Sequence, residues 1–274
     1  MIELTEALPF AKKANESLKG LEIINAEVLK FPHKFAWFNH ENDLFKNKLM
    51  NRQIVEVTSS AHFIRFILDN QNELAISEDV SFTYANQLSN KTKHQLKLDL
   101  SNGYSLIFQI KLYGFVLLGT KDELSEQQHY YRKAIEAISP LDDRFTFEYF
   151  KERTMLDSKK GSLKQALATE QHIPGFGNGL LQDVLFHAKM SPKRKISLLT
   201  EEDNKNLYQK LIEKITEIVT KGGRDLQIDM FGERGGYTTL MTSARDTCPI
   251  CHQPLSKEAY LGGKVIYCPF CQIE

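Results

Sequence analysis

The stretch CPICHQPLSKEAYLGGKVIYCPFC at residues 248–271 contains every cysteine of this 274-residue chain. The cysteines form two Cys-x-x-Cys pairs, Cys248 with Cys251 and Cys268 with Cys271. Each pair can hold two thiolates on one tight turn, and two such turns can surround a tetrahedral zinc ion. The alternative is a pair of disulfides in a secreted chain, but the start of the sequence does not resemble a signal peptide. We therefore expect one structural Zn²⁺ per chain, because four thiolates leave no open position for catalysis.

A hairpin is predicted between the two pairs. Gly262-Gly263 favours a tight turn, with strands at residues 260–261 and 264–267. A ribbon this small cannot bury a core of its own, so metal binding has to supply its folding free energy, on the order of 10–16 kcal/mol. A metal-held hairpin commonly presents a side chain to a partner. We expect Lys264, at the tip, to be that side chain.

The composition is ordinary for a globular protein. A length of 274 residues predicts about two domains, and no apolar run approaches the roughly 20 residues that a membrane span requires. We therefore expect a cytoplasmic protein with no membrane partner. The formal net charge is zero, yet residues 151–200 carry nine Lys/Arg against four Asp/Glu. Either a solvated surface or a binding site for a polyanion would explain this local excess.

The N-terminal half is predicted to be mainly β-structure. A helix is expected at residues 5–18, capped by Thr5. Asn102-Gly103 indicates a type I′ hairpin turn. Several short strands separated by turns favour a β-sandwich, which we expect to span residues 1–122. Alternating or β-branched residues predict its strands at 21–29, 53–58, 61–68, 94–100 and 104–110.

The C-terminal half is predicted to be helical as far as Gly222-Gly223, and residues 222–247, which show no clear period, are expected to form a long loop and a strand that leads into the cysteines. Ser162 can cap a helix, and Thr200 with Asp203 approximates a capping box for a long amphipathic helix. The whole chain is therefore expected to be α+β. We place a helical domain at residues 123–245 and a four-cysteine zinc finger at residues 246–274.

A tight turn, Gly175-Phe176-Gly177-Asn178, interrupts this helical half. We expect Asn178 to cap the helix that follows. Glycines let the backbone approach a ligand closely, and the start of a helix attracts anions such as phosphate. Lys164 lies one helix earlier. Together with the positive charge of this segment, the turn favours DNA binding over a purely structural role.

These motifs resemble the formamidopyrimidine-DNA glycosylase/endonuclease VIII family along the whole chain. Lys164, the Gly-Phe-Gly-Asn turn and Pro192 resemble its helix–two-turn–helix, and Gly262-Gly263-Lys264 with the second cysteine pair resembles its zinc finger. The resemblance implies a monomer that clamps bent, damaged double-stranded DNA and flips the damaged base. It implies that Lys164 and Asn178 hold the phosphates beside that nucleotide. Lys264 stands where the family has an arginine, so the charge is kept but the bidentate fork is lost.

The chain departs from this family where chemistry is expected. The family begins Met-Pro-Glu-Leu-Pro-Glu, loses the methionine and attacks the sugar with the proline amine, whereas this chain begins MIELTE. Ile2 is not a secondary amine, and we expect Met1 to stay, which displaces the free amine by one residue. Glu3 and Glu6 match the family's two acids. His62 stands where the family has a catalytic lysine; the alternative is an ordinary surface residue of a strand.

Two functions from different classes follow. In the first, the protein is a DNA glycosylase in which Glu3 activates water, so that the base is released with weak or absent AP-lyase activity. Lys111 and Tyr113 would stand for the family's intercalating residues, while residues 73–80 contain no counterpart of its methionine loop. In the second, the site is inactive and the protein binds bent or damaged DNA. Borohydride trapping and mass spectrometry of the N-terminus distinguish the two.

Overall fold

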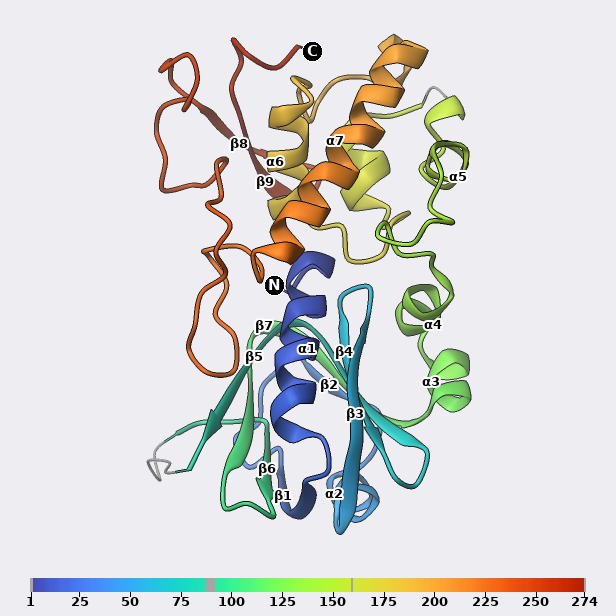
Figure 1. Ribbon diagram of the computed structural model, residues 1–274, viewed down its shortest axis with the longest axis vertical. Coiled ribbons are helices and arrows are strands. Elements are labelled where there is room, and N and C mark those ends of the chain that lie inside the picture. Colours follow the sequence, from blue (N-terminus) through green and yellow to red (C-terminus); the bar gives the residue numbers. More distant parts are fainter. Residues whose placement is uncertain (1, 87–91, 159, 274) are drawn as a thin grey trace. The chain divides into compact units, whose positions relative to one another are not determined.

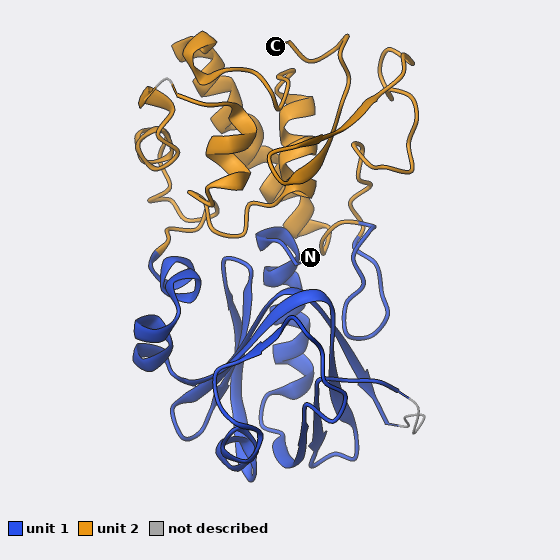
Figure 2. Cartoon of the chain, turned by 180° about the vertical axis from the view of Figure 1, so that it is seen from behind, with its two compact units in different colours: residues 1–136, 225–235 blue, residues 137–224, 236–274 orange. Residues whose placement is uncertain are grey.

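The computed structural model describes residues 2–86, 92–158 and 160–273, which form two compact units (Figure 2). The first unit comprises residues 1–136 and 225–235, and the second comprises residues 137–224 and 236–274. The first unit thus extends beyond the boundary predicted at residue 122. The reason is that helices α3 (Lys121–Gln127) and α4 (His129–Glu136) bury Leu124 and Tyr131 against strand residues of this unit.

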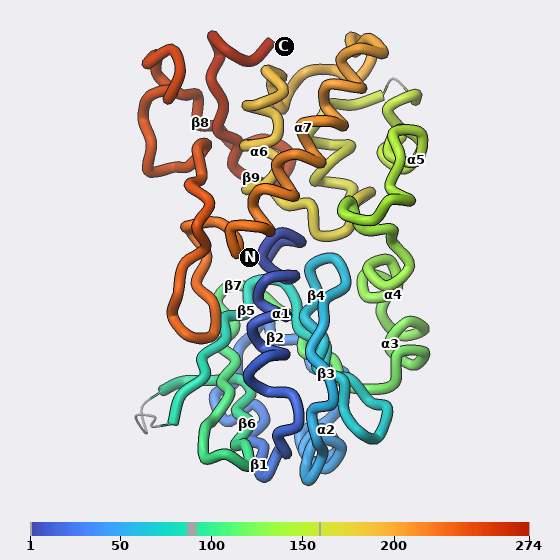
Figure 3. Tube along the Cα trace, viewed as in Figure 1, coloured from blue at the N-terminus to red at the C-terminus, as the bar shows by residue number. Residues whose placement is uncertain are grey.

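Unit 1 contains a closed β-sheet and a long helix, α1 (Leu4–Leu18), which begins within one residue of the prediction (Figure 1). Its N-cap is Glu3, so the predicted cap at Thr5, which lies inside the helix, is wrong. The strand order is β2-β7-β5-β4-β3-β1-β6, and β6 also pairs with β7, so the sheet closes on itself. Figure 3 shows β1 and β6 running side by side despite their distance in sequence. The strands are β1 (Glu22–Val28), β2 (Ala36–Phe38), β3 (Arg52–Ser60), β4 (Phe63–Leu68), β5 (Asn72–Ala85), β6 (Leu96–Leu100) and β7 (Ser105–Thr120).

The core of unit 1 lies between α1 and the sheet. Ala7, Phe10 and Leu18 of the helix share one buried cluster with Phe66 and Phe108 of the strands. The predicted α+β fold with an N-terminal β-sandwich domain is therefore confirmed. The short strand β2, the helix α2 (Asn42–Leu49), the strand β5 and the second half of β7 were not predicted.

Two hairpin turns differ from the predictions, one in its type and one in its position. At Asn102-Gly103 only the glycine has a positive φ, 84°, and its N–H donates to the Leu100 carbonyl at 3.0 Å. This is a type I turn followed by a left-handed glycine, so the predicted type I′ turn is wrong. The type I′ conformation instead occurs at Leu261 (φ 45°) and Gly262 (φ 74°). The turn of the finger hairpin therefore starts one residue earlier than predicted.

Unit 2 combines three α-helices, a π-helix η2 (Gln165–Thr169), and the 3-10 helices η1 (Leu156–Ser158) and η3 (Ile196–Leu198) with the finger hairpin. The α-helices are α5 (Phe147–Arg153), α6 (Asn178–His187) and α7 (Glu201–Thr220), and the hairpin strands are β8 (Ser256–Tyr260) and β9 (Gly263–Tyr267). The capping box of Thr200 and Asp203 is confirmed. Asn178 is the first residue of α6, and Gly177 is its N-cap, so the predicted cap is displaced by one residue. Among the described residues, no helix is both long and apolar enough to span a bilayer.

The segment 225–235 lies between two parts of unit 2 in the sequence but belongs to unit 1. Lys13 of α1 binds the carboxylates of Asp229 and Glu233, and the Tyr84 N–H donates to the Met230 carbonyl at 2.9 Å. The sequence of this stretch has no regular period and predicted a long loop. The segment is nevertheless ordered. Its order comes from ion pairs and backbone bonds to distant residues.

Candidate nucleic-acid interface and metal centre

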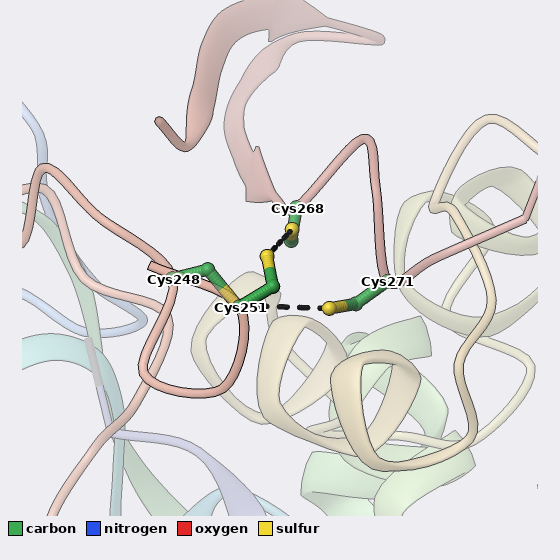
Figure 4. Close-up of side chains that lie close together, drawn as sticks. All are labelled: Cys248, Cys251, Cys268 and Cys271. Atoms are coloured by element: carbon green, nitrogen blue, oxygen red, sulfur yellow. Dashed lines mark hydrogen bonds between the residues drawn. The ribbon is translucent and has the colours of Figure 1, made fainter. Parts of the chain in front are cut away.

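The four cysteines converge on one point (Figure 4). All four thiols are free, and their sulfur atoms lie within 4.8 Å of one another. The Sγ atoms of Cys248 and Cys271 are 3.8 Å apart, and those of Cys251 and Cys268 are 3.5 Å apart. A tetrahedral ion with Zn–S bonds of about 2.3 Å would separate its sulfurs by about 3.8 Å. The geometry therefore fits a metal ion with four thiolate ligands.

This metal centre is not isolated from the rest of unit 2. Cys248 and Cys268 are fully buried and share an apolar cluster with Phe186 of α6 and Met241. The Ile266 N–H also donates to the Gln182 side chain of α6. The finger therefore packs part of its apolar surface against α6. This packing was not predicted from the sequence, which indicated only that the finger is too small to bury a core of its own.

The finger hairpin meets two predicted DNA-binding residues at its turn. Lys164 is 1% exposed, and its Nζ donates to the carbonyls of Tyr260 and, at 3.2 Å, of Leu261. A Cβ atom built on Gly263 would lie 2.6 Å from Asn178 Nδ2 and 3.2 Å from Lys164 Nζ. Position 263 is therefore glycine because the Asn178 amide occupies the space of any side chain.

The environment of this turn is electropositive. Burial lowers the pKa of Lys164 because its ammonium group is desolvated. The positive end of the α6 dipole lies at Asn178, whose Oδ1 is buried without a hydrogen-bond partner in the described part of the chain. Lys264, next to the turn, is exposed. The structure thus brings Lys164, Asn178 and the finger turn together, with Lys164 beneath the turn rather than on the surface.

The two N-terminal acids lie at the start of α1. Glu3 is 5% exposed and Glu6 is fully buried. They form a capping box in which the Glu3 N–H donates to Glu6 Oε2 at 3.2 Å, and the Thr5 hydroxyl donates to Glu6 Oε1 at 3.1 Å. Glu6 therefore fixes the start of the helix. Met1, the other candidate here, lies outside the described residues.

His62 is not a surface residue of a strand. It lies in the turn between β3 and β4, beside Ala61 with φ 51°, and is 5% exposed. Its Nε2 lies 3.3 Å from Glu78 Oε1. Glu78 was not a predicted site residue, yet its carbonyl oxygen also accepts the Ile2 N–H at 2.9 Å. A signal in the sequence was the pair of adjacent acidic residues, Glu78-Asp79, in the middle of the strand β5.

Lys111 and Tyr113 lie on a bulge opposite this charged pair. Glu78 pairs with Gly114 and Val80 pairs with Ile110, so three residues of β7 face only Asp79. Both predicted residues are exposed on this protruding segment. The Tyr113 hydroxyl donates to the Glu78 side chain, and burial together with the Glu78 charge raises the pKa of Tyr113 to about 12.

A pocket of about 410 Å³ opens beside the bulge, entirely within unit 1. Ile2, Asp79 and Lys111 line one part of it, and Phe10 and Phe82 contribute aromatic surface. Residues 226–232 complete the wall. A pocket with aromatic surface and a few charged groups is suited to a small planar ligand.

Comparisons with known proteins agree with this architecture. Residues 137–229 match the family model of the formamidopyrimidine-DNA glycosylase H2TH domain. The formamidopyrimidine-DNA glycosylase of Rickettsia massiliae is 26% identical over 99% of this chain and 97% of its own length, and that of Pelotomaculum thermopropionicum is 25% identical over 99% of both. The chain thus contains an H2TH domain of the formamidopyrimidine-DNA glycosylase type and is similar to these enzymes along its whole length. The family resemblance seen in the sequence is thus confirmed.

Solved structures of this family share the fold. The Fpg protein of Thermus thermophilus superposes with a TM-score of 0.82 at 23% identity, covering 98% of both chains. The Fpg protein of Lactococcus lactis, solved in complex with DNA containing an abasic site, superposes with a TM-score of 0.84 at 20% identity, covering 99% of this chain and all of that one. The similarity therefore extends over the β-sandwich, the helices and the finger.

Proposed function

We propose that the protein is a monomeric, cytoplasmic DNA-repair glycosylase that binds damaged double-stranded DNA and releases a damaged base by hydrolysis of its N-glycosidic bond. The observation that carries this proposal is the convergence of Lys164, Asn178 and the finger turn at Gly263. Full-length relatives are named formamidopyrimidine-DNA glycosylases, and structural neighbours were solved on DNA containing an abasic site or Fapy-dG. Both findings support the assignment.

The DNA contact would be made at the finger turn. Asn178 can donate from Nδ2 to a phosphate oxygen at the start of α6, and exposed Lys264 can pair with a neighbouring phosphate. Lys164 would act from beneath, because its ammonium group holds two hairpin carbonyls and adds positive charge to the turn. A Zn²⁺ ion bound by the four cysteines would fix the hairpin in this position.

The covalent route to strand cleavage is expected to be weak. The nitrogen of Ile2 is an amide that donates to the Glu78 carbonyl, so it cannot serve as a nucleophile. His62, in the place of the family's lysine, is buried. Hydrolysis in which a carboxylate takes a proton from the attacking water requires neither an amine at residue 2 nor a lysine at position 62. The sequence assigns that role to Glu3, and Lys111 and Tyr113 are the candidates to fill the space left by the base.

Base release and borohydride trapping test this proposal together. Zinc-loaded protein is incubated with duplexes containing Fapy-dG or an oxidized pyrimidine, and the free base is measured by mass spectrometry. We expect base release, little trapped protein–DNA adduct and little cleavage of abasic sites. Efficient trapping through the Met1 amine would contradict the hydrolytic mechanism.

A second candidate is a catalytically inactive protein that binds bent or damaged DNA. The burial of Glu3 and Glu6 in a helix cap favours it, because carboxylates engaged in capping are poorly placed to activate water. Tight binding to the same duplexes without base release would support this candidate against the enzyme.

A further inference from the structure

Glu78 has a backbone conformation that is rare for its residue type. Its φ is 72°, in the left-handed region that favours glycine, and it lies where the pairing of β5 with β7 is interrupted. Such strained residues cost of order 1–3 kcal/mol and are concentrated at functional sites. Here the strained backbone presents the Glu78 carbonyl to the Ile2 N–H. The start of the chain and the bulge are therefore joined at this residue.

Two acid–base side chains flank the Glu78 carboxylate. His62 Nε2 lies 3.3 Å from Oε1, at ion-pair distance, and the Tyr113 hydroxyl donates a hydrogen bond to the side chain. His62 is 95% buried, and within the described residues neither of its ring nitrogens has a hydrogen-bond partner. A buried imidazole without hydrogen bonds costs about 1–3 kcal/mol, and the Glu78 carboxylate at ion-pair distance can offset this cost for His62.

This cluster borders the 410 Å³ pocket of unit 1. Ile2, which binds the Glu78 carbonyl, and Asp79, the next residue in the chain, both line the pocket. The Glu78 side chain is partly exposed, at 16%, so water can reach it. Glu3 does not line this pocket. Glu78 does not line it either, but the Glu78 side chain is partly exposed, whereas Glu3 is buried in the cap of α1. Of the two carboxylates, Glu78 is therefore the more accessible to water.

We propose that Glu78, rather than Glu3, is the general base of the hydrolysis, an inference that rests on the proposed function. With the base of a flipped nucleotide in the pocket, a water molecule gives a proton to the Glu78 carboxylate as its oxygen bonds to the sugar C1′. The C1′–N bond breaks, and its electron pair leaves on the base nitrogen. The proton then returns from Glu78 through solvent to that nitrogen, which yields the free base and an abasic sugar. His62 and Tyr113 are positioning residues that hold the carboxylate.

Single-turnover base release from a Fapy-dG duplex tests the inference with matched substitutions. Glu78→Gln should slow base release about 100-fold or more, the usual range for a lost general base, while the Kd for DNA stays within about threefold. Glu56→Gln, which changes an exposed carboxylate on β3, should behave as wild type. Glu3→Gln should keep at least about ten times the rate of Glu78→Gln.

A second variant distinguishes chemistry from structure. Tyr113→Phe removes the hydrogen bond to the Glu78 carboxylate and so makes the carboxylate easier to protonate. The charged groups around it, His62 and Asp79, are unchanged. The acidic limb of the pH–rate profile should therefore move to higher pH. A structural role alone would lower the rate without moving this limb.

The outcomes separate the inference from the proposed function. If Glu78→Gln retains the wild-type rate while Glu3→Gln loses activity, the inference is overturned and the base is Glu3. An unmoved acidic limb in Tyr113→Phe also counts against it, whatever the folding of Glu78→Gln. If the wild type releases no base from Fapy-dG or oxidized-pyrimidine duplexes, the proposed function fails and the inference fails with it.

Discussion

Replacing Gly263 with alanine should weaken DNA binding without unfolding the finger. Gly263 does not have a positive φ, so its backbone conformation accepts alanine. The added methyl group would lie 2.6 Å from Asn178 Nδ2, where ordinary contacts begin at 3.4 Å. The Asn178 amide must therefore move by about 0.8 Å, whereas Lys164 Nζ, at 3.2 Å, needs only a slight adjustment.

The size of the effect follows from the contact that the amide would lose. A hydrogen bond to a charged group such as a phosphate contributes about 1.5–3 kcal/mol. Its loss corresponds to a roughly 10- to 100-fold increase in Kd. Gly262→Ala is the matched control. Nothing lies within 4 Å of its added methyl group, but its φ of 74° makes alanine unfavourable by about 1–2 kcal/mol.

The assay is fluorescence anisotropy with a duplex containing a tetrahydrofuran abasic-site analogue, at one fixed salt concentration. Gly263→Ala should bind more weakly with unchanged zinc content. Gly262→Ala should have a lower Tm but a nearly normal Kd. Equal affinities for Gly263→Ala and wild type would refute the idea that the Asn178 amide contacts phosphate. A similar loss of affinity in both variants would show that general disturbance of the turn, not displacement of the amide, is responsible.

Three further predictions concern the metal, the charge and the stability of unit 2. Cys268→Ser, or zinc chelation, should remove the bound metal in elemental analysis and abolish DNA binding, while the circular dichroism of the β-sandwich persists. Lys264→Ala should reduce the slope of log Kd against log salt by about 0.9 and weaken all sequences alike, as titrations between salt concentrations would show. Hydrogen bonds from Lys214 and then Lys221 lower the pKa of Glu217 from 4.5 to about 2. The contribution of Glu217 to the stability of the folded state is therefore complete above about pH 4.5 and is lost as the pH falls towards 2. Glu217→Gln should consequently make Tm less dependent on pH between these values.

The features predicted well from the sequence depend on residues that are close together in the chain. The cysteine pairs fix their own turns, and the capping box of Thr200 and Asp203 needs only four consecutive residues. The Gly-Phe-Gly-Asn turn before α6 is equally local. These patterns carry enough information to predict the metal centre and the helix–two-turn–helix, because the chemistry of each depends on short spacing.

The features that could not be predicted depend on pairing between distant segments. Glu78 gains its environment from the register of β5 against β7, which sets Gly114 opposite it and allows Tyr113 to reach it. His62 is buried because its turn packs near this bulge rather than facing solvent. No local pattern encodes such register. The same holds for the segment 225–235, whose place in unit 1 depends on ion pairs with Lys13.

The contact between Ile2 and Glu78 also bears on how the chain differs from its family. A proline at position 2, with Met1 still attached, would have no N–H to donate to the Glu78 carbonyl. Ile2 keeps this bond, and its burial at 4% exposure anchors the N-terminus against the bulge. Residues 2 and 78 are thus directly bonded. The backbone nitrogen of residue 2, the position of the family's nucleophile, donates a hydrogen bond that supports the strained backbone of Glu78. Restoring a proline alone would remove that support, so the backbone of Glu78 depends on an N–H group at residue 2.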